Sequence, residues 1–416
     1  MEERGYSTTS FTVNGRTYKL PARPVAVICI DGCADEYLNT SLAKGYMPRL
    51  QRMLEGDGFR SIVRSALPSF TNVNNASIAT GVPPSVHGIA GNFFLDPETG
   101  DEVMMNSASF LRSGTILAAA ARVGRRVAMV TAKEKLRDLL SHELEGIAFS
   151  AEKAAHARQV THGISDVERL VGESTPPIYS ANASLFVLRS GVALLETGAA
   201  DFMYLSLTDY MQHKHAPEET ASLNFYRAID AEMGRLADLG AIVAATADHG
   251  MNAKQQLGGD PNVIYLETRL KEELGDGVRV ILPITDPYVL HHGALGSFAV
   301  VHLADASRTA EVIRTLMEIG GVTEVLDRET AARKMDLPAD RIGDLVVLSA
   351  RNVVLGRTPE HHDLAALQGG LRSHGGRYEE MVPLLLSKPL TPEYARKAAA
   401  DPRNFDVFDF ALNGTC

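Results

Sequence analysis

Residues 241–250 read Ala-Ile-Val-Ala-Ala-Thr-Ala-Asp-His-Gly, an apolar run that ends in two polar side chains and a glycine. Short, nearly continuous apolar runs are typical of parallel strands buried on both faces of a sheet. In open α/β sheets, binding sites form beyond the carboxyl ends of such strands. We therefore expect Asp248 and His249 at the edge of the sheet where a site would form.

Other parts of the chain repeat this pattern. Apolar runs of the same kind occupy residues 25–30, 127–131 and 202–208. Amphipathic segments with helical periodicity lie at residues 47–54, 114–123, 181–197 and 223–239. Alternation of strands with amphipathic helices predicts an α/β fold, with a mostly parallel sheet flanked by helices.

Residues 254–369 differ in sequence pattern from the rest of the chain, because Gly and Pro separate short predicted elements. The expected elements are strands at 278–282 and 297–303, a helix at 308–319 and a strand pair around Val322 and Leu345. This segment contains none of the six candidate metal ligands described below, and one of them follows it. We therefore predict a core domain of residues 1–253 and 370–416 and an inserted α+β cap domain of residues 254–369.

Composition excludes several classes of protein. The 416 residues have a formal net charge of −10, whereas nucleic-acid-binding proteins are normally basic. The apolar runs are far shorter than the roughly 20 residues of a membrane span. Residues 1–24 lack the apolar core of a secretory signal, and Cys29, Cys33 and Cys416 form no C-x-x-C pair. We expect a cytoplasmic protein with reduced thiols that binds neither nucleic acid nor membranes.

Six residues have side chains that bind metals and follow strand-like runs or precede glycines: Asp31, Asp209, His213, Asp248, His249 and His374. The i,i+4 spacing of Asp209 and His213 places both on one face of a helical turn, although Asp209 could also be a simple helix cap. Asp31 alone is equally typical of a turn, and His374 alone of a loop. Together, three carboxylates and three imidazoles favour two zinc ions, or manganese or iron, over magnesium or calcium.

Thr71 is the candidate nucleophile. It stands where a turn leads into a helix, and the N–H groups and dipole of a helix start favour an alkoxide and a bound anion. A metal that lowers the pKa of the hydroxyl would make Thr71 reactive at neutral pH. The alternative is a threonine that only caps the helix.

The order of these motifs resembles the alkaline phosphatase superfamily, in the nucleotide pyrophosphatase/phosphodiesterase branch that uses one threonine nucleophile. The matching residues are Asp31, Thr71, Thr80-Gly81, His87-Gly88-Ile89, Asn92, Asp209, His213, Asp248-His249-Gly250 and His374-Gly375. Within that superfamily the chain is most similar to the phosphonoacetate hydrolases. The resemblance implies an alkaline phosphatase-like fold and a hydrolase of phosphonate catabolism that cleaves a carbon–phosphorus bond, releasing acetate and phosphate through a phospho-threonine.

The resemblance also implies roles for individual residues. One zinc would be bound by Asp31, Asp248, His249 and the Thr71 hydroxyl, and the other by Asp209, His213 and His374. Asn92 would donate to a phosphoryl oxygen. Lys133 and Lys135, just beyond the apolar run at 127–131, would bind the carboxylate of the substrate and support the departing carbon, although a solvated helix start is the alternative.

The substrate is expected to be a small phosphonate dianion. The charge of two divalent ions would exceed the negative charge of the three aspartates, so the site would have a net positive charge. His215 and His292 are weaker candidates for substrate contacts, and His291 and His292 could close over the ligand; surface loops are the alternative. The diesterase branch usually has Phe-Pro-Asn after its threonine, whereas Thr71 is followed by Asn72-Val73-Asn74, which argues against a nucleotide.

Two other functions stay open. A phosphodiesterase or nucleotide pyrophosphatase could use the same metal core, and a binding protein could retain the fold without turnover. The presence of Thr71 together with all six candidate ligands argues against the second. We also allow for assembly as a homodimer.

Overall fold

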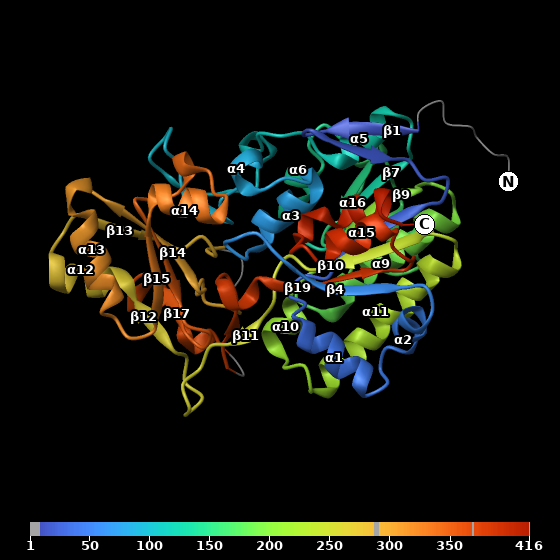
Figure 1. Ribbon diagram of the computed structural model, residues 1–416. Coiled ribbons are helices and arrows are strands. Elements are labelled where there is room, and N and C mark those ends of the chain that lie inside the picture. Colours follow the sequence, from blue (N-terminus) through green and yellow to red (C-terminus); the bar gives the residue numbers. More distant parts are fainter. Residues whose placement is uncertain (1–8, 287–290, 368–369, 416) are drawn as a thin grey trace.

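The computed structural model describes residues 9–286, 291–367 and 370–415. Two predictions involve residues outside these ranges: Cys416, and residues 1–8 of the segment expected to lack a secretory signal. The described chain forms a larger lobe around a long sheet and a smaller lobe beside it (Figure 1). Among the described helices, none combines the length and apolar character needed to cross a membrane.

A seven-stranded sheet organises the larger lobe. In spatial order its strands are β4 (Phe59–Arg64), β19 (Met381–Leu386), β10 (Ile242–Thr246), β3 (Val25–Cys29), β9 (Phe202–Ser206), β7 (Val127–Thr131) and β8 (Ile147–Ser150). The five strands from β10 to β8 pair in parallel, and β19 pairs antiparallel with both of its neighbours. Every residue of β3, β7, β9 and β10 is buried, because helices cover both faces.

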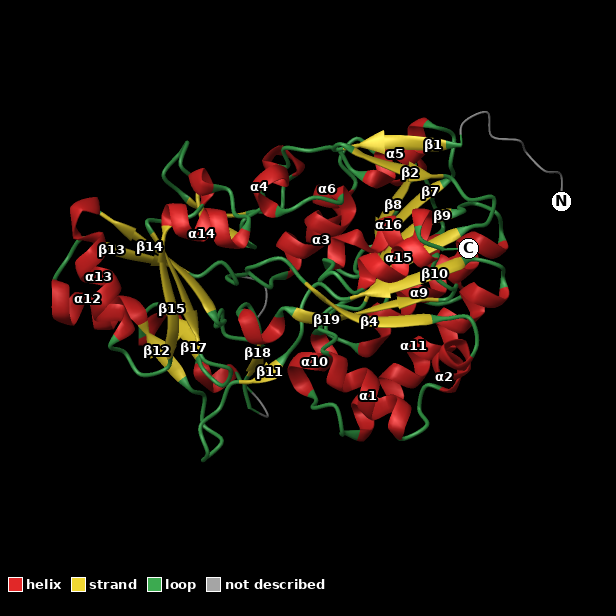
Figure 2. Ribbon diagram, viewed as in Figure 1, coloured by secondary structure: helices red, strands yellow, loops and turns green. Residues whose placement is uncertain are grey.

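The helices form a layer on each side of this sheet (Figure 2). On one side, α9 (Ala181–Glu196) and α11 (Thr220–Asp238) pack on the strands, with α1 (Asp35–Ala43) and α2 (Pro48–Glu55) against α11. On the other side are α3 (Thr71–Thr80), α5 (Ile116–Arg122), α6 (Glu134–Leu140) and α16 (Val407–Asn413). Shorter helices are α4 (Pro84–His87), α7 (Gln159–His162), α8 (Val167–Val171), α10 (Tyr210–Lys214) and α15 (Pro392–Ala398).

The smaller lobe is built on an antiparallel four-stranded sheet. Its strands are β13 (Val278–Ile281), β14 (Phe298–Leu303), β16 (Leu345–Ser349) and β15 (Val322–Asp327). Its helices are α12 (Leu266–Leu274), α13 (Thr309–Met317) and α14 (Arg328–Met335). Strand pairs outside the two main sheets are β1 (Ser10–Val13) with β2 (Arg16–Lys19), β5 (Phe93–Leu95) with β6 (Glu102–Met104), β11 (Asn252–Ala253) with β18 (Arg372–Ser373), and β12 (Val263–Tyr265) with β17 (Val354–Gly356).

The hydrophobic core has two large parts. One surrounds the long sheet, and the other lies under the smaller sheet. The second part also includes residues from before position 254, such as Phe70, Ile89 and Phe94. The two lobes therefore share apolar packing, and the division into a core and a cap of residues 254–369 stays a prediction.

The predicted α/β architecture is confirmed, with differences at the edges of the large sheet. The four apolar runs became β3, β7, β9 and β10, within two residues of the expected ends. Strands β4, β8 and β19 were not foreseen. The sequence FRSIVR of β4 mixes polar and apolar residues without a regular pattern. Strand β19, MVPLLL, contains Pro383, and a proline within an apolar run argues against a strand inside a sheet.

Candidate active site

Three neighbouring strands bring the predicted acidic ligands together. Asp31, Asp209 and Asp248 each follow the carboxyl end of a strand, and those strands, β3, β9 and β10, lie next to one another in parallel. All three aspartates are buried. Carboxyl ends of parallel strands share one edge, so this placement follows from the sheet itself.

The predicted ligands form overlapping clusters. Asp31, Asp248 and His249 have ligand atoms within 4.8 Å of one another, and so do Asp209, His249 and His374. A third group of the same compactness joins Asp209, His213 and His291. The structure thus gathers all six predicted metal ligands, and it adds His291, which the sequence had suggested only as a residue that closes over the ligand.

Backbone contacts orient the three imidazoles. Each one donates from Nδ1 to a backbone carbonyl oxygen: His213 to Arg372 at 2.7 Å, His249 to Gly250 at 2.8 Å and His374 to Ser69 at 2.8 Å. A neutral histidine that donates from Nδ1 has its lone pair on Nε2. The Nε2 atoms of all three rings lie within 4 Å of an aspartate oxygen, as expected for a set of metal ligands.

Unsatisfied polar atoms show that this cluster fits a metal centre. Both carboxylate oxygens of Asp31 and the Nε2 atom of His213 are buried. Among the described residues, none of these three atoms has a hydrogen-bond partner. Buried carboxylates and imidazole lone pairs that face one another are costly unless a cation lies between them. The donor set, with oxygen and nitrogen ligands, suits a transition metal.

Thr71 lies beside this cluster as the first residue of α3. Phe70 occupies the N-cap position, so Thr71 is not the capping residue that the alternative interpretation required. Its hydroxyl Oγ1 is 3.4 Å from His249 Nε2 and is buried. The hydroxyl therefore stands where it can approach both a metal and a bound phosphoryl group.

Asn92 is oriented by the backbone next to Thr71. Its side-chain Oδ1 accepts a hydrogen bond of 3.0 Å from the Asn72 N–H. With Oδ1 engaged in this way, the Nδ2 group is the part of the amide available to a ligand. Asn92 and Thr71 line the same pocket, so the predicted role of Asn92 as a donor agrees with its placement.

Lys133 and Lys135 reach the same pocket from the segment after β7, but their partners differ. Lys133 Nζ is 2.9 Å from Asp209 Oδ1 and 3.6 Å from Asp31 Oδ2. Burial lowers the pKa of Lys133, but the carboxylates of Asp209 and Asp31 outweigh it, so the pKa is raised. Lys135 pairs with Asp286, and burial together with the charge of Lys133 lowers its pKa.

The pocket is small and enclosed by both lobes. Its lining residues are Thr71, Asn92, Lys133, Lys135, Asp209, Ile284, Asp286, His291, His292 and His374. Lys133, Lys135 and Asp286 also line a larger adjoining pocket of about 430 Å³. Asp286 and Ile284 were missed from the sequence, because nothing in their local pattern distinguishes them from other loop residues.

The two weaker candidates for substrate contacts, His292 and His215, differ in their position relative to the pocket. His292 lines the pocket, and its Nδ1 accepts a hydrogen bond of 3.1 Å from the Ala294 N–H, so the neutral ring has its proton on Nε2. His215 is not among the lining residues; its Nδ1 lies 2.7 Å from Glu219 Oε2 at the end of α10. A substrate contact by His215 stays a prediction without support from its position.

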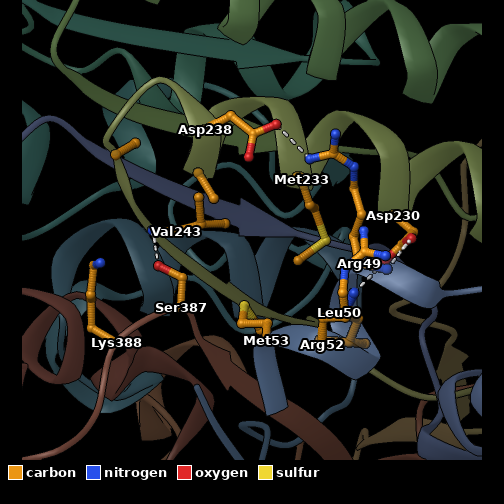
Figure 3. Close-up of a pocket in the computed structure, with 13 residues that line it drawn as sticks. Arg49, Leu50, Arg52, Met53, Asp230, Met233, Asp238, Val243, Ser387 and Lys388 are labelled. Carbon is orange, nitrogen blue, oxygen red and sulfur yellow. Dashed lines mark hydrogen bonds and ion pairs between the residues drawn. The ribbon is translucent and has the colours of Figure 1, made fainter. Parts of the chain in front are cut away.

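Another pocket lies at the opposite end of β10 and has a different character (Figure 3). Its charged groups are largely matched within the protein. The Arg49 guanidinium is 2.6 Å from Asp238, and Asp230 accepts hydrogen bonds from the N–H groups of Arg49 and Leu50. We assign no function to this pocket.

Comparison with known proteins places the chain in a family. The type I phosphodiesterase / nucleotide pyrophosphatase family matches residues 25–377. The chain belongs to this family. The matched region contains all six predicted ligands and Thr71.

Two solved structures are similar over nearly the whole chain. Phosphonoacetate hydrolase from Sinorhizobium meliloti 1021, in complexes with phosphonoacetate and with phosphonoformate, is 47% identical, with a TM-score of 0.93 over 99% of this chain and 100% of that chain. This similarity confirms the predicted resemblance to the phosphonoacetate hydrolases and the predicted alkaline phosphatase-like fold.

More distant relatives show the fold alone or match a short segment. Murine ectonucleotide pyrophosphatase / phosphodiesterase 5 in complex with AMP is 15% identical, with a TM-score of 0.62 over 94% of this chain and 96% of that chain. An uncharacterized pyrophosphatase/phosphodiesterase of Schizosaccharomyces pombe is 36% identical over 78 residues, which are 19% of this chain. That match covers only 15% of the yeast protein.

Proposed function

We propose that this protein is a phosphonoacetate hydrolase, which converts phosphonoacetate and water into acetate and phosphate. One observation supports this function above the others: the pocket that contains Thr71 and Asn92 is also lined by two lysines, the buried Lys133 and the partly buried Lys135. A 47% identical structure is described in complex with phosphonoacetate. The small size of the pocket suits this small dianion better than a nucleotide.

Two zinc ions would be bound by the six predicted ligands and Thr71. Asp31, Asp248, His249 and the Thr71 hydroxyl would hold one, and Asp209, His213 and His374 the other. Such ions supply Lewis-acid stabilisation of charge on the phosphoryl oxygens and on the nucleophile. Manganese or iron could replace zinc with the same ligands.

Thr71 is the nucleophile in this proposal. Its hydroxyl gives up its proton to water, Oγ1 attacks phosphorus, a new O–P bond forms, and the C–P bond breaks on the opposite side. The electron pair of the C–P bond passes to the carbon of the leaving group, which takes a proton from water to give acetate. A second water molecule then hydrolyses the phospho-threonine and releases phosphate.

Asn92 and the lysines stabilise the charges that this reaction moves. Asn92 Nδ2 donates to a phosphoryl oxygen, since its Oδ1 is engaged by the Asn72 N–H. A bare carbanion is a very poor leaving group, but the adjacent carboxylate delocalises its charge as an enediolate-like species. Lys133 and Lys135 provide the positive charge that such a species requires. His292, with its proton on Nε2, is a further donor at the pocket wall.

The location and assembly of the protein stay predictions. Cys29 and Cys33 are both buried and free, which fits the predicted cytoplasmic location with reduced thiols. The homodimer also stays a prediction, which the mass of the protein in solution would test.

A phosphate-release assay tests the proposed function. Purified protein loaded with zinc is compared on phosphonoacetate and on a 4-nitrophenyl phosphate diester. We expect hydrolysis of phosphonoacetate with one acetate formed per phosphate. Efficient cleavage of the diester together with no release of phosphate from phosphonoacetate would replace this proposal with the diesterase.

A further inference from the structure

Asn75 links the nucleophile to a predicted metal ligand. It lies one helical turn after Thr71 on α3 and is completely buried. Its Nδ2 group donates to the Thr71 carbonyl oxygen at 3.0 Å and to Asp248 Oδ2 at 3.1 Å. One amide group therefore contacts both the backbone of the nucleophile and the side chain of an acidic ligand.

The other end of the same amide is attached to the sheet. Asn75 Oδ1 lies 2.8 Å from the Tyr204 hydroxyl and 2.7 Å from the Ser206 hydroxyl, and both residues belong to β9. A flipped amide would place its oxygen against a carbonyl and a carboxylate, so this orientation alone satisfies all four contacts. Fully satisfied buried networks of this kind hold their members rigidly.

Asp248 depends on this network for the orientation of one oxygen. Its Oδ1 accepts hydrogen bonds from the N–H groups of Gly32 and His249, at 3.2 and 3.0 Å. Its Oδ2 is the atom that Asn75 contacts, and it lies 3.8 Å from His249 Nε2. Both oxygens are therefore held, and the carboxylate is kept in the cluster that it forms with Asp31 and His249.

We propose that Asn75 is a positioning residue, which fixes the Asp248 carboxylate and the Thr71 backbone in one frame. It would thereby preorganise the metal site of Asp31, Asp248 and His249 next to the nucleophile. Hydrogen bonds to ligating groups typically change metal affinity by about 10- to 100-fold. This inference rests on the proposed function only for the role of Thr71, since the metal cluster is defined by its own geometry.

Three variants separate positioning from general stability. Asn75→Ala removes all four contacts, and Asn75→Asp retains the acceptor toward Tyr204 and Ser206 but turns a carboxylate toward Asp248. Tyr204→Phe removes one contact on the sheet side and leaves the donor to Asp248 in place. Asn413→Ala, which removes the contacts of a partly exposed asparagine to Thr17 and Asp409 far from the cluster, serves as the control.

Zinc affinity is measured by competition with a chelating dye, and folding is checked by circular dichroism and by the melting temperature in EDTA. We expect one of the two zinc ions to bind about 10- to 100-fold more weakly in both Asn75 variants, with the other little changed. Tyr204→Phe should lose less than Asn75→Ala, and Asn413→Ala should bind zinc normally. If Asn75→Ala does not fold, the comparison of Asn75→Asp with Tyr204→Phe decides in the same way.

Unchanged affinity for both zinc ions in the folded Asn75 variants would overturn the inference. Equal weakening of both ions would overturn it as well, because it would indicate a general loss of structure rather than an effect on one site. A wild-type protein that binds zinc but does not hydrolyse phosphonoacetate would end the proposed function and leave the role of Asn75 in metal binding intact.

Discussion

Lys133 Nζ lies 2.9 Å from Asp209 Oδ1, in the pocket that also contains Thr71. The lysine expected to bind the substrate carboxylate therefore also contacts a predicted metal ligand. Lys135 contacts Asp286 instead, which is not among the predicted ligands. The two lysines are thus expected to respond differently when one of them is replaced.

The first prediction concerns these lysines. Replacing either one by alanine should lower kcat/KM for phosphonoacetate by about 10²-fold or more, because the departing carbon loses a charge-assisted contact. Aryl phosphate esters should be much less affected by Lys135→Ala, since their leaving group needs no cation. Lys133→Ala should in addition weaken zinc binding, because Asp209 loses its partner. Steady-state kinetics on both substrates and a zinc titration measure these effects. Equal losses on the two substrates in Lys135→Ala would assign this lysine to the fold alone.

The second prediction concerns the nucleophile. Thr71→Ala should lower turnover of phosphonoacetate by several orders of magnitude, because the phosphoryl group has no acceptor. Thr71→Ser retains a hydroxyl and should keep part of the activity. Rapid acid quenching followed by mass spectrometry should detect phosphate on residue 71 in the wild type. Near-normal rates in the alanine variant would remove Thr71 from the mechanism.

The third prediction concerns metal content. The purified protein should contain about two transition-metal ions per chain and lose its activity to chelators, with recovery when zinc is added. His213→Ala and His374→Ala should each mainly empty one site, since both belong to the predicted Asp209 site. Elemental analysis after gel filtration gives the stoichiometry. Full activity in EDTA without bound metal would contradict the mechanism.

The fourth prediction concerns acid stability. Burial lowers the pKa of His87 to about 3, and its Nδ1 accepts a hydrogen bond from the Ile89 N–H. The unfolded chain, with an ordinary histidine pKa of 6.5, binds more protons than the folded chain between these two values. Stability from this group is therefore complete above pH ~6.5 and falls as the pH drops toward ~3, by up to about 1.4 kcal/mol per pH unit.

Urea unfolding in EDTA at about pH 7 and about pH 5 measures this effect without a contribution from metal release. The wild type should lose about 2 kcal/mol more than His87→Gln over this interval. The same pH dependence in both proteins would show that His87 is not the group responsible.

Several features of the site could be predicted because they depend on local sequence. Asp31, Asp209 and Asp248 follow apolar runs, and the carboxyl ends of parallel strands meet at one edge whatever the detailed packing. The spacing of Asp209 and His213 required only one helical turn, which α10 provides. The positions of these residues at the edge were therefore readable before the tertiary structure was known.

Contacts between distant segments were beyond the reach of local patterns. Nothing in the local sequence distinguishes His215 from His292 as a pocket residue, yet of these two only His292 lines the pocket. The pairing of Lys135 with Asp286 joins residues 151 positions apart. Such pairs depend on how the smaller lobe packs against the large sheet, and this packing is the sum of many weak contacts.

The sequence by itself determined the central parallel strands, the types of the candidate ligands and the class of chemistry, because burial on both faces and side-chain chemistry are local properties. Only the tertiary structure decided which strands close the edges of the sheet, that Lys133 contacts Asp209, and that Asn75 connects Thr71 to Asp248. The physical reason is distance along the chain: Asn75 and Asp248 are separated by 173 positions, and a hydrogen bond of 3.1 Å between them exists only once α3 and β10 have packed in place.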